Sequence, residues 1–194
     1  MSSAAEVFKY DGGPRFLAQW RRDMTLAQAF ALSNVAVYQE VARRVGLVDL
    51  QARVRALGYG NAQVGEAVDR FWLDGPLAIS AVEQVLFLDR LLRGELPVTE
   101  RALVQLREMA LVERGDGYRL YGKTGWSTAT EPGVGWWVGW LEQGDQRAVF
   151  ALNMPMHEVA EAPRRLALVR AALQALDKLP ARAEDACCAT APVQ

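Results

Sequence analysis

Lys123-Thr124-Gly125 is the tripeptide whose residue types are best suited to bind a carboxylate. Lysine supplies a fixed cation and threonine supplies a hydroxyl. The tripeptide falls at the end of a segment whose aromatic and β-branched residues predict a strand. Because glycine has no Cβ, Gly125 would let the backbone of a ligand approach closely. Alone, the tripeptide is a weak indication of function, since a lysine at a strand end is usually solvated.

Four other positions carry residues that could contribute to a site. Ser33-Asn34-Val35 lies at a break between two expected helices, where Ser33 or Asn34 can simply cap the second helix. Tyr59-Gly60-Asn61 predicts a turn with Asn61 in a left-handed conformation. Trp72 is by default an anchor of the core or of a loop. Arg165 opens the last expected helix, where a cation is mildly unfavourable against the helix dipole.

Composition limits the class of protein. The chain has 194 residues, of which 51% are hydrophobic and 23% are charged, which is typical of a folded domain. A net charge of −1 gives no reason to expect nucleic acid or a membrane surface as a partner. The apolar runs are too short to span a membrane, and the N-terminal residues lack the pattern of a signal peptide.

Metal and cofactor chemistry has little support in the residue types. The chain has one histidine, His157, so a zinc site is not expected, and it has no glycine-rich phosphate loop. Cys187 and Cys188 are adjacent and cannot connect distant segments, so no disulfide framework is expected.

The elements that must position these residues predict an α+β fold. A block of helices comes first, then three short antiparallel strands, then a C-terminal helix that covers the sheet. We expect one domain over residues 1–180 and a disordered tail over residues 181–194. The helices are expected at 26–32, 35–45, 49–57, 81–93, 101–112 and 164–178, and the strands at 118–126, 134–142 and 147–154.

Six motifs in order give these residues a common context. The series resembles the class D serine β-lactamases (oxacillinases) from about Phe8 to Leu179, and six ordered motifs are far more specific than any one of them. The motifs are Ser33-x-Val35, Tyr59-Gly60-Asn61, Phe71-Trp72-Leu73-x-Gly75, Ile79-Ser80-Ala81, Lys123-Thr124-Gly125-Trp126 and Trp136-Trp137-Val138-Gly139-Trp140.

The resemblance implies acyl transfer from a β-lactam to a serine, followed by hydrolysis of the acyl-enzyme. Ser33 would shuttle a proton to the β-lactam nitrogen, and Lys123 would help to tune the Ser33 hydroxyl for this role. Lys123 and Thr124, together with Arg165, would bind the carboxylate of the substrate beside Gly125. The backbone N–H of Trp126 would be one of two oxyanion donors.

The resemblance also implies supporting roles. Tyr59, Asn61 and Val35 would line the site, and Trp72 would pack beside a carbamylated lysine that acts as general base. No metal is implied, and the only cofactor would be the CO2-derived carbamate. The implied ligands are β-lactam antibiotics, the implied compartment is the periplasm, and the oligomeric state is not predicted.

The chain departs from the family at one decisive motif. The family carries its nucleophile and its carbamylated lysine in one Ser-x-x-Lys motif, and none of the serines here has a lysine three positions later. Those serines are Ser2, Ser3, Ser33, Ser80 and Ser127. We therefore expect an N-terminally truncated relative that is inactive alone. The missing segment would include the first sheet strands, which would leave the Lys123 strand with an unpaired edge open to aggregation.

Alternatives remain open at this point. A penicillin-sensing receptor domain resembles the same family, and a non-catalytic protein could reuse the scaffold. A cell-wall transpeptidase is a weaker alternative, because Tyr59-Gly60-Asn61 and Trp136-Trp137 favour the β-lactamase.

Overall fold

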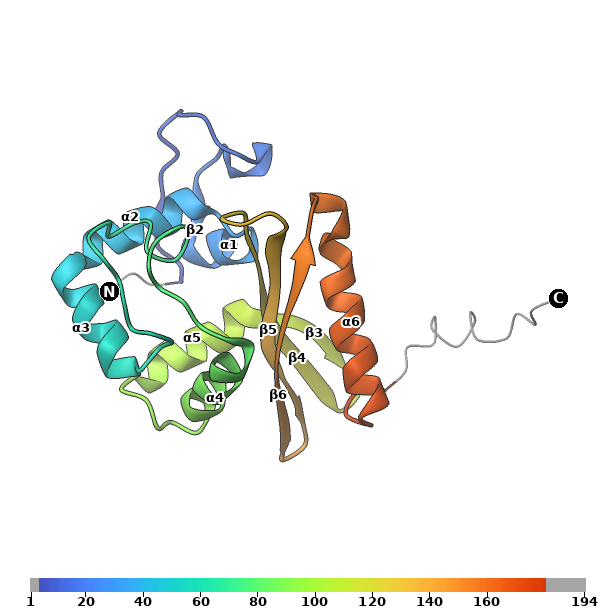
Figure 1. Ribbon diagram of the computed structural model, residues 1–194. Coiled ribbons are helices and arrows are strands. Elements are labelled where there is room, and N and C mark those ends of the chain that lie inside the picture. The colour runs from blue at the N-terminus through green and yellow to red at the C-terminus, as the bar shows by residue number, and fades with distance from the viewer. Residues whose placement is uncertain (1–3, 181–194) are drawn as a thin grey trace.

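A four-stranded antiparallel sheet separates the helices into two layers in the computed structural model, which describes residues 4–180 (Figure 1). The helices α1 to α5 lie on one side of the sheet and α6 lies on the other. The α+β prediction is therefore confirmed. The strands follow the order β3-β4-β5-β6, with bounds Leu111–Gly115, Tyr118–Ser127, Gly133–Gln143 and Gln146–Met156.

Strand β3 was missed by the sequence prediction, which continued the preceding helix to residue 112. Helix α5 instead ends at Ala110, and Leu111 begins a strand that pairs with Tyr118–Tyr121. Gly115 lies opposite Tyr118, so Asp116-Gly117 forms a two-residue hairpin loop, with Gly117 at φ +74°. Asp-Gly between apolar segments is a strong hairpin signal, and it was available in the sequence.

The sheet has the expected open edge on the Lys123 strand and a second one that was not expected. Strand β4 pairs with β5 from Tyr118 to Ser127, but with β3 only from Tyr118 to Tyr121. Among the described strands, the stretch that carries Lys123 is therefore bonded on one side only. Within residues 4–180, β6 pairs with β5 alone, so a second open edge runs along β6, and the sequence did not indicate this edge.

Helix α6, Ala162–Ala175, covers one face of the sheet and forms the largest apolar cluster with it. Trp137 of β5 is 1% exposed and packs edge-on against Phe150 of β6, with ring centroids 4.9 Å apart. Val169 and Leu173 of α6 close this cluster from the helix side. The helix is thus held firmly on the sheet, and this fixes the position of its first turn.

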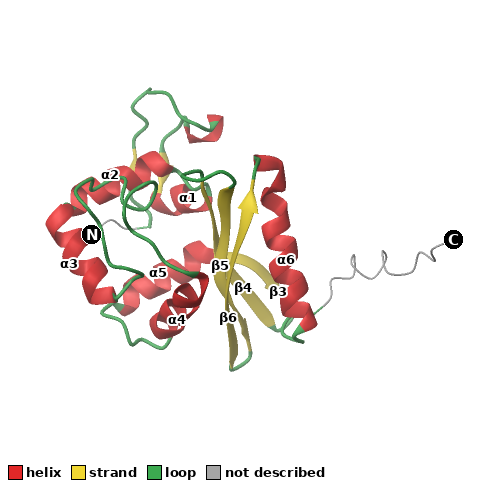
Figure 2. Ribbon diagram, in the orientation of Figure 1, coloured by secondary structure: helices red, strands yellow, loops and turns green. Residues whose placement is uncertain are grey.

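The helical block lies on the opposite face, and all of its helices except α3 begin with a side-chain cap. Thr25 and Ser80 each form a capping box, and Asn34 accepts a hydrogen bond from the Val37 N–H. These helices are α1 Leu26–Ala31, α2 Val35–Val45, α3 Leu47–Leu57, α4 Ala81–Leu92 and α5 Glu100–Ala110. A long loop connects α3 to α4 (Figure 2).

Short elements complete the described part of the chain. Strands β1 Val7–Phe8 and β2 Met24–Thr25 pair beside α1, and two 3-10 turns lie at Ala18–Trp20 and Val159–Glu161. None of the helices within residues 4–180 has both the length and the apolar character needed to cross a membrane. The predicted tail 181–194, with Cys187 and Cys188, lies outside the described residues.

Candidate functional site

The Lys123 side chain lies between the sheet and the helical block. Its ammonium donates a hydrogen bond to the hydroxyl of Ser33 and another to the Thr124 carbonyl oxygen at 2.6 Å. It also lies 5.7 Å from the ring centroid of Phe30 on α1, which is a cation–π contact. Phe30 was not predicted as a site residue, because nothing in the sequence around Phe30 indicates a contact with a residue so distant along the chain.

Ser33 is held in an unusual backbone conformation between α1 and α2. Its φ is 52°, in the left-handed region that non-glycine residues seldom adopt. The next residue, Asn34, is 2% exposed and caps α2 with its side chain. Because Asn34 caps the helix, the Ser33 hydroxyl is left to contact Lys123. Val35 begins α2 and is half-buried.

Arg165 connects α6 to the strands at the same end of the sheet. It is 8% exposed, and its guanidinium donates to the carbonyl oxygens of Gly125 and, at 3.5 Å, of Trp136. A further bond to the Ala162 carbonyl at 3.1 Å holds the side chain against its own helix. Arg165, whose charge is mildly unfavourable at a helix start, is therefore buried and connects α6 to the sheet by hydrogen bonds.

Two positive charges meet at this place without a compensating acid. Burial, and to a smaller extent the nearby charge of Arg165, lower the pKa of Lys123 to about 8. Burial also lowers the pKa of Arg165. No carboxylate within residues 4–180 forms an ion pair with either Lys123 or Arg165. An anionic ligand would find two cations that protein carboxylates do not already neutralise.

The three residues beside Lys123 leave space around the strand end. Thr124 is exposed, and a Cβ at Gly125 would meet only the Trp136 Cβ, at 3.6 Å. The Trp126 indole Nε1 is buried and has no hydrogen-bond partner among the described atoms. The structure thus brings together Ser33, Lys123, Thr124, Gly125 and Arg165, with Trp126 following directly along β4.

Tyr59 makes its contacts with α4. Its hydroxyl donates to Gln84 at 2.8 Å, and its ring meets Phe87 edge-on with centroids 4.7 Å apart. Burial raises the pKa of the Tyr59 hydroxyl. Trp72 packs edge-on against Phe71 at 4.8 Å within the α3–α4 loop. The roles suggested for Tyr59 and Trp72 at the site therefore stay predictions.

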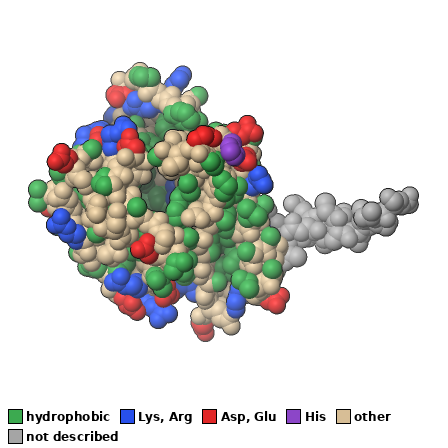
Figure 3. Space-filling model, viewed as in Figure 1, with side chains coloured by type: hydrophobic (Ala, Val, Ile, Leu, Met, Phe, Trp, Pro, Cys, Tyr) green, Lys and Arg blue, Asp and Glu red, His purple; other side chains and the backbone are tan. Residues whose placement is uncertain are grey.

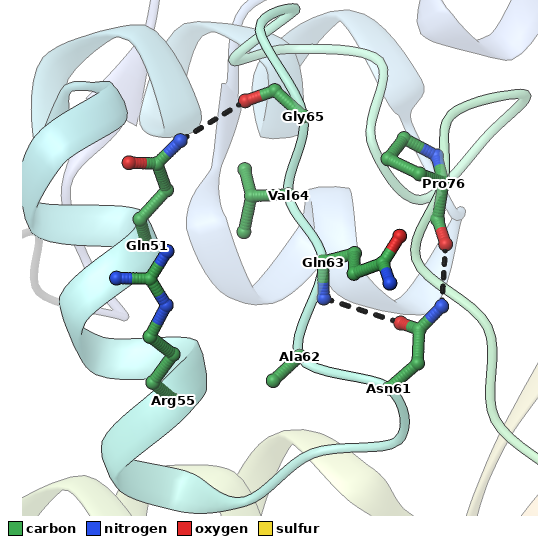
Figure 4. Close-up of a pocket in the computed structure, with 8 residues that line it drawn as sticks. All are labelled: Gln51, Arg55, Asn61, Ala62, Gln63, Val64, Gly65 and Pro76. Atoms are coloured by element: carbon green, nitrogen blue, oxygen red, sulfur yellow. Dashed lines mark hydrogen bonds between the residues drawn. The ribbon is translucent and has the colours of Figure 1, made fainter.

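Asn61 braces the α3–α4 loop. Its side chain donates to the Pro76 carbonyl at 2.7 Å and accepts from the backbone N–H of Gln63 (Figure 4). It also accepts from the backbone N–H of Ala78. The prediction that Asn61 is left-handed is wrong, since the positive φ angles belong to Gly60 and Ala62. A Cβ at Gly60 would lie 2.1 Å from the Ala78 carbonyl oxygen, so the close loop crossing requires glycine there.

A cavity of about 390 Å³ lies between α3 and this loop, and its lining includes Asn61 but none of Ser33, Lys123 or Arg165 (Figure 4). The surface is also hollowed where the helical block meets the sheet (Figure 3). Residues 4–180 contain no group of three His, Cys, Asp or Glu side chains arranged to hold a metal ion.

Comparison with known proteins places this geometry in a family. The model of the penicillin-binding protein transpeptidase domain matches residues 3–174. A crystal structure of the class D β-lactamase YbXI from Nostoc superposes with a TM-score of 0.89 at 38% identity, over 92% of this chain and 76% of that one. The chain belongs to the penicillin-binding transpeptidase family, with the class D β-lactamases as its relatives.

Curated class D β-lactamases agree with this assignment. β-Lactamase OXA-5 of Pseudomonas aeruginosa is 40% identical over 163 residues, which are 82% of this chain and 61% of that protein. β-Lactamase OXA-48 of Klebsiella pneumoniae is 44% identical over 151 residues, which are 78% of this chain and 57% of that protein. The chain thus spans about three fifths of the length of these class D relatives.

Proposed function

We propose that this class D β-lactamase-like chain binds β-lactam antibiotics at the Lys123–Arg165 site and does not hydrolyse them by itself. The observation that carries the proposal is the pair of cations beside the second half of β4, with which no carboxylate of residues 4–180 forms an ion pair. A β-lactam of the penicillin type presents one carboxylate next to its ring. That single negative charge complements the two positive charges.

The strand end supplies the other contacts of the proposed complex. The Thr124 hydroxyl can donate a hydrogen bond to the same carboxylate. The space beside Gly125 admits the body of the ligand. From Gly122 to Ser127 strand β4 has no second strand partner among the described strands, so its backbone can pair with an amide of the ligand. The backbone N–H of Trp126 is our proposed oxyanion donor.

Ser33 is the proposed proton carrier of the site. Its hydroxyl accepts a hydrogen bond from Lys123, so a proton can pass between the lysine and a ligand atom beside the serine. Val35, Tyr59 and Asn61 would line the approach to the site, and Trp72 would support it from the loop. These assignments rest on the motif order, together with the contact between Ser33 and Lys123.

The absence of turnover follows from the residues available. None of the five serines begins a Ser-x-x-Lys motif, so the chain offers neither the acylated serine nor the carbamylated lysine of the family. The CO2-derived carbamate therefore has no lysine of that motif to form on, and we derive no step through it. Binding groups alone retain only a small part of the catalysis of such a site.

Two measurements on the 194-residue protein test the proposal. Equilibrium dialysis with labelled benzylpenicillin at about pH 6, where Lys123 carries its charge, should show saturable binding that weakens in Arg165→Ala. The exposed neighbour Arg164→Ala serves as the control and should bind normally. Nitrocefin should not be turned over continuously. Binding that is equal in both variants, or sustained turnover abolished by Lys123→Ala, would contradict the proposal. A periplasmic location is likewise a proposal, drawn from the family.

A further inference from the structure

The Lys123 amine is an unused nucleophile in the proposed site. Its hydrogen-bonding partners in the structure are the Ser33 hydroxyl and the Thr124 carbonyl, and its nearest aromatic contact is Phe30. Lys123 is half-buried, and no carboxylate of residues 4–180 forms an ion pair that would keep it protonated. With its pKa lowered to about 8, a large fraction of Lys123 is neutral amine in mildly alkaline solution.

We propose that Lys123 is itself acylated by the bound β-lactam, so that each chain captures one antibiotic molecule as a stable amide. The proposal rests on the proposed function, because the same site must first hold the ligand. It adds a covalent step and a modified residue that simple binding does not require.

The geometry supports attack by the amine. Arg165 reaches the carbonyl oxygen of Gly125, two positions along β4 from Lys123, so a carboxylate at the guanidinium places the attached ring near the Lys123 amine. Because Gly125 has no side chain, the approach of the ring to the Lys123 amine along β4 stays open. Proximity of this kind is a large part of any rate acceleration.

The step balances without a further reactant. The neutral Nζ of Lys123 attacks the lactam carbonyl carbon and forms a C–N bond, and the C–N bond of the ring breaks. One proton leaves Nζ for the Ser33 oxygen, while the Ser33 hydroxyl gives its own proton to the departing ring nitrogen. The product is a secondary amide that contains every atom of the antibiotic. Nothing is oxidised or reduced, and no water is consumed.

The character of the bond distinguishes this reaction from that of a serine enzyme. An ester on serine is hydrolysed readily and is cleaved by hydroxylamine, whereas an amide on lysine resists both. The reaction therefore stops after one event in each chain. Such a protein would remove β-lactam stoichiometrically, in proportion to its own concentration.

The chain provides its own internal controls. It contains only three lysines, Lys9, Lys123 and Lys178. Lys9 forms an exposed ion pair with Asp23 at 2.7 Å, so it reports the background reactivity of a surface amine. Specific acylation would mark Lys123 well before the other two.

The test is mass spectrometry of the whole 194-residue protein after incubation with benzylpenicillin at about pH 9, above the Lys123 pKa and below that of an ordinary lysine. We expect one added antibiotic mass, located on Lys123 by peptide mapping and retained after hydroxylamine. Lys123→Arg should lose it, and Lys178→Arg should keep it. Ser33→Gly should slow its formation roughly 100-fold, the lower range for loss of a proton-transfer group.

The outcomes separate this proposal from the proposed function. Saturable binding at about pH 6, with Lys123 fully charged, together with no adduct at about pH 9, above its pKa, would leave the binding function standing and overturn acylation. A hydroxylamine-sensitive adduct on a serine would also overturn it, as would equal labelling of Lys9 and Lys123. Absence of binding would overturn both proposals. Circular dichroism of each variant shows whether a lost adduct reflects a lost fold.

Discussion

The Lys123 ammonium donates a hydrogen bond to the hydroxyl of Ser33, a residue 90 positions earlier in the chain. This contact joins the loop between α1 and α2 to the strand β4. It depends on a division of tasks between neighbours, since Asn34 caps α2 while Ser33 adopts the left-handed conformation that turns the chain. Stability and chemistry at this point can therefore be changed separately.

Ser33→Gly should keep or raise the free energy of unfolding, by up to about 1 kcal/mol, because glycine adopts a positive φ without strain. Asn34→Ala should lower it by about 1–2 kcal/mol, since the α2 cap and a buried hydrogen bond are lost. Urea unfolding of both variants measures the difference. Equal destabilisation by the two changes would show that the Ser33 side chain itself supports the fold.

Substitution by alanine at two glycines of the sheet should have very different effects on stability. A Cβ at Gly139 would lie 2.0 Å from the backbone oxygen of Tyr121, so Gly139→Ala should unfold the protein or destabilise it severely. A Cβ at Gly125 meets only an ordinary contact, so Gly125→Ala should leave the melting temperature nearly unchanged.

The same Gly125→Ala variant should nevertheless bind benzylpenicillin less tightly, because its methyl group occupies the path of the ligand. Thermal melts and equilibrium dialysis on one preparation test both halves of this prediction. Unchanged binding with an unchanged melting temperature would show that the ligand does not approach β4 at this glycine.

Arg165 and Arg164 are adjacent on α6 but differ in burial. Arg165→Ala removes donors from the Gly125 and Trp136 carbonyls and should cost about 1–3 kcal/mol. Arg164 forms an exposed ion pair with Glu161, so Arg164→Ala should change the free energy of unfolding by less than about 1 kcal/mol. Chemical denaturation compares them directly. A larger loss in Arg164→Ala would be inconsistent with the bridging role of Arg165.

The lowered pKa of Lys123 predicts that the free energy of unfolding depends on pH in a specific way. Its pKa in the folded protein is about 8, below the ordinary value of 10.5, so between these values the unfolded chain binds the extra proton. The free energy of unfolding should therefore rise with pH across this window, and below about pH 8 the burial penalty is fully present. Arg165 is the charged group that adds to the effect.

Lys123→Met isolates this contribution from other titrating groups. The variant should be more stable than the parent by about 1–2 kcal/mol at neutral pH, and the gap should close as the pH approaches the ordinary lysine pKa. Denaturation curves at about pH 7, below the window, and at about pH 10, near its upper end, measure it. A gap that stays constant with pH would mean that Lys123 is solvated in the folded protein.

The local sequence was sufficient for much of the fold. The cap at Asn34 acts within one turn, so the local pattern indicated the start of α2. Strand β3 was missed because the helical periodicity of α5 continues into Leu111 and Val112. The hairpin formed by Asp116-Gly117 overrides that periodicity, as strand pairing often does with helix propensity.

The site was predictable only as a set of motifs. The sequence indicated Lys123 and Arg165 through the resemblance, but not that Arg165 is buried under β4 and β5. Phe30 and Trp136 contact these cations because of how α1 and β5 are packed, and no spacing along the chain encodes that. The local turn at Asn61 was misassigned, because which residue of a turn becomes left-handed depends on the loop that crosses it.

The two cations beside β4 form no ion pair with a carboxylate of residues 4–180, and this affects the energetics of the whole molecule. Lys123 and Arg165 repel one another in the free protein, so the ligand-free fold is under electrostatic strain at the place where its two layers join. A small carboxylate would act as the missing counter-charge of the fold. Its binding to the folded state alone shifts the unfolding equilibrium in proportion to the logarithm of its concentration. A bound carboxylate would then complete the charge balance of the folded protein.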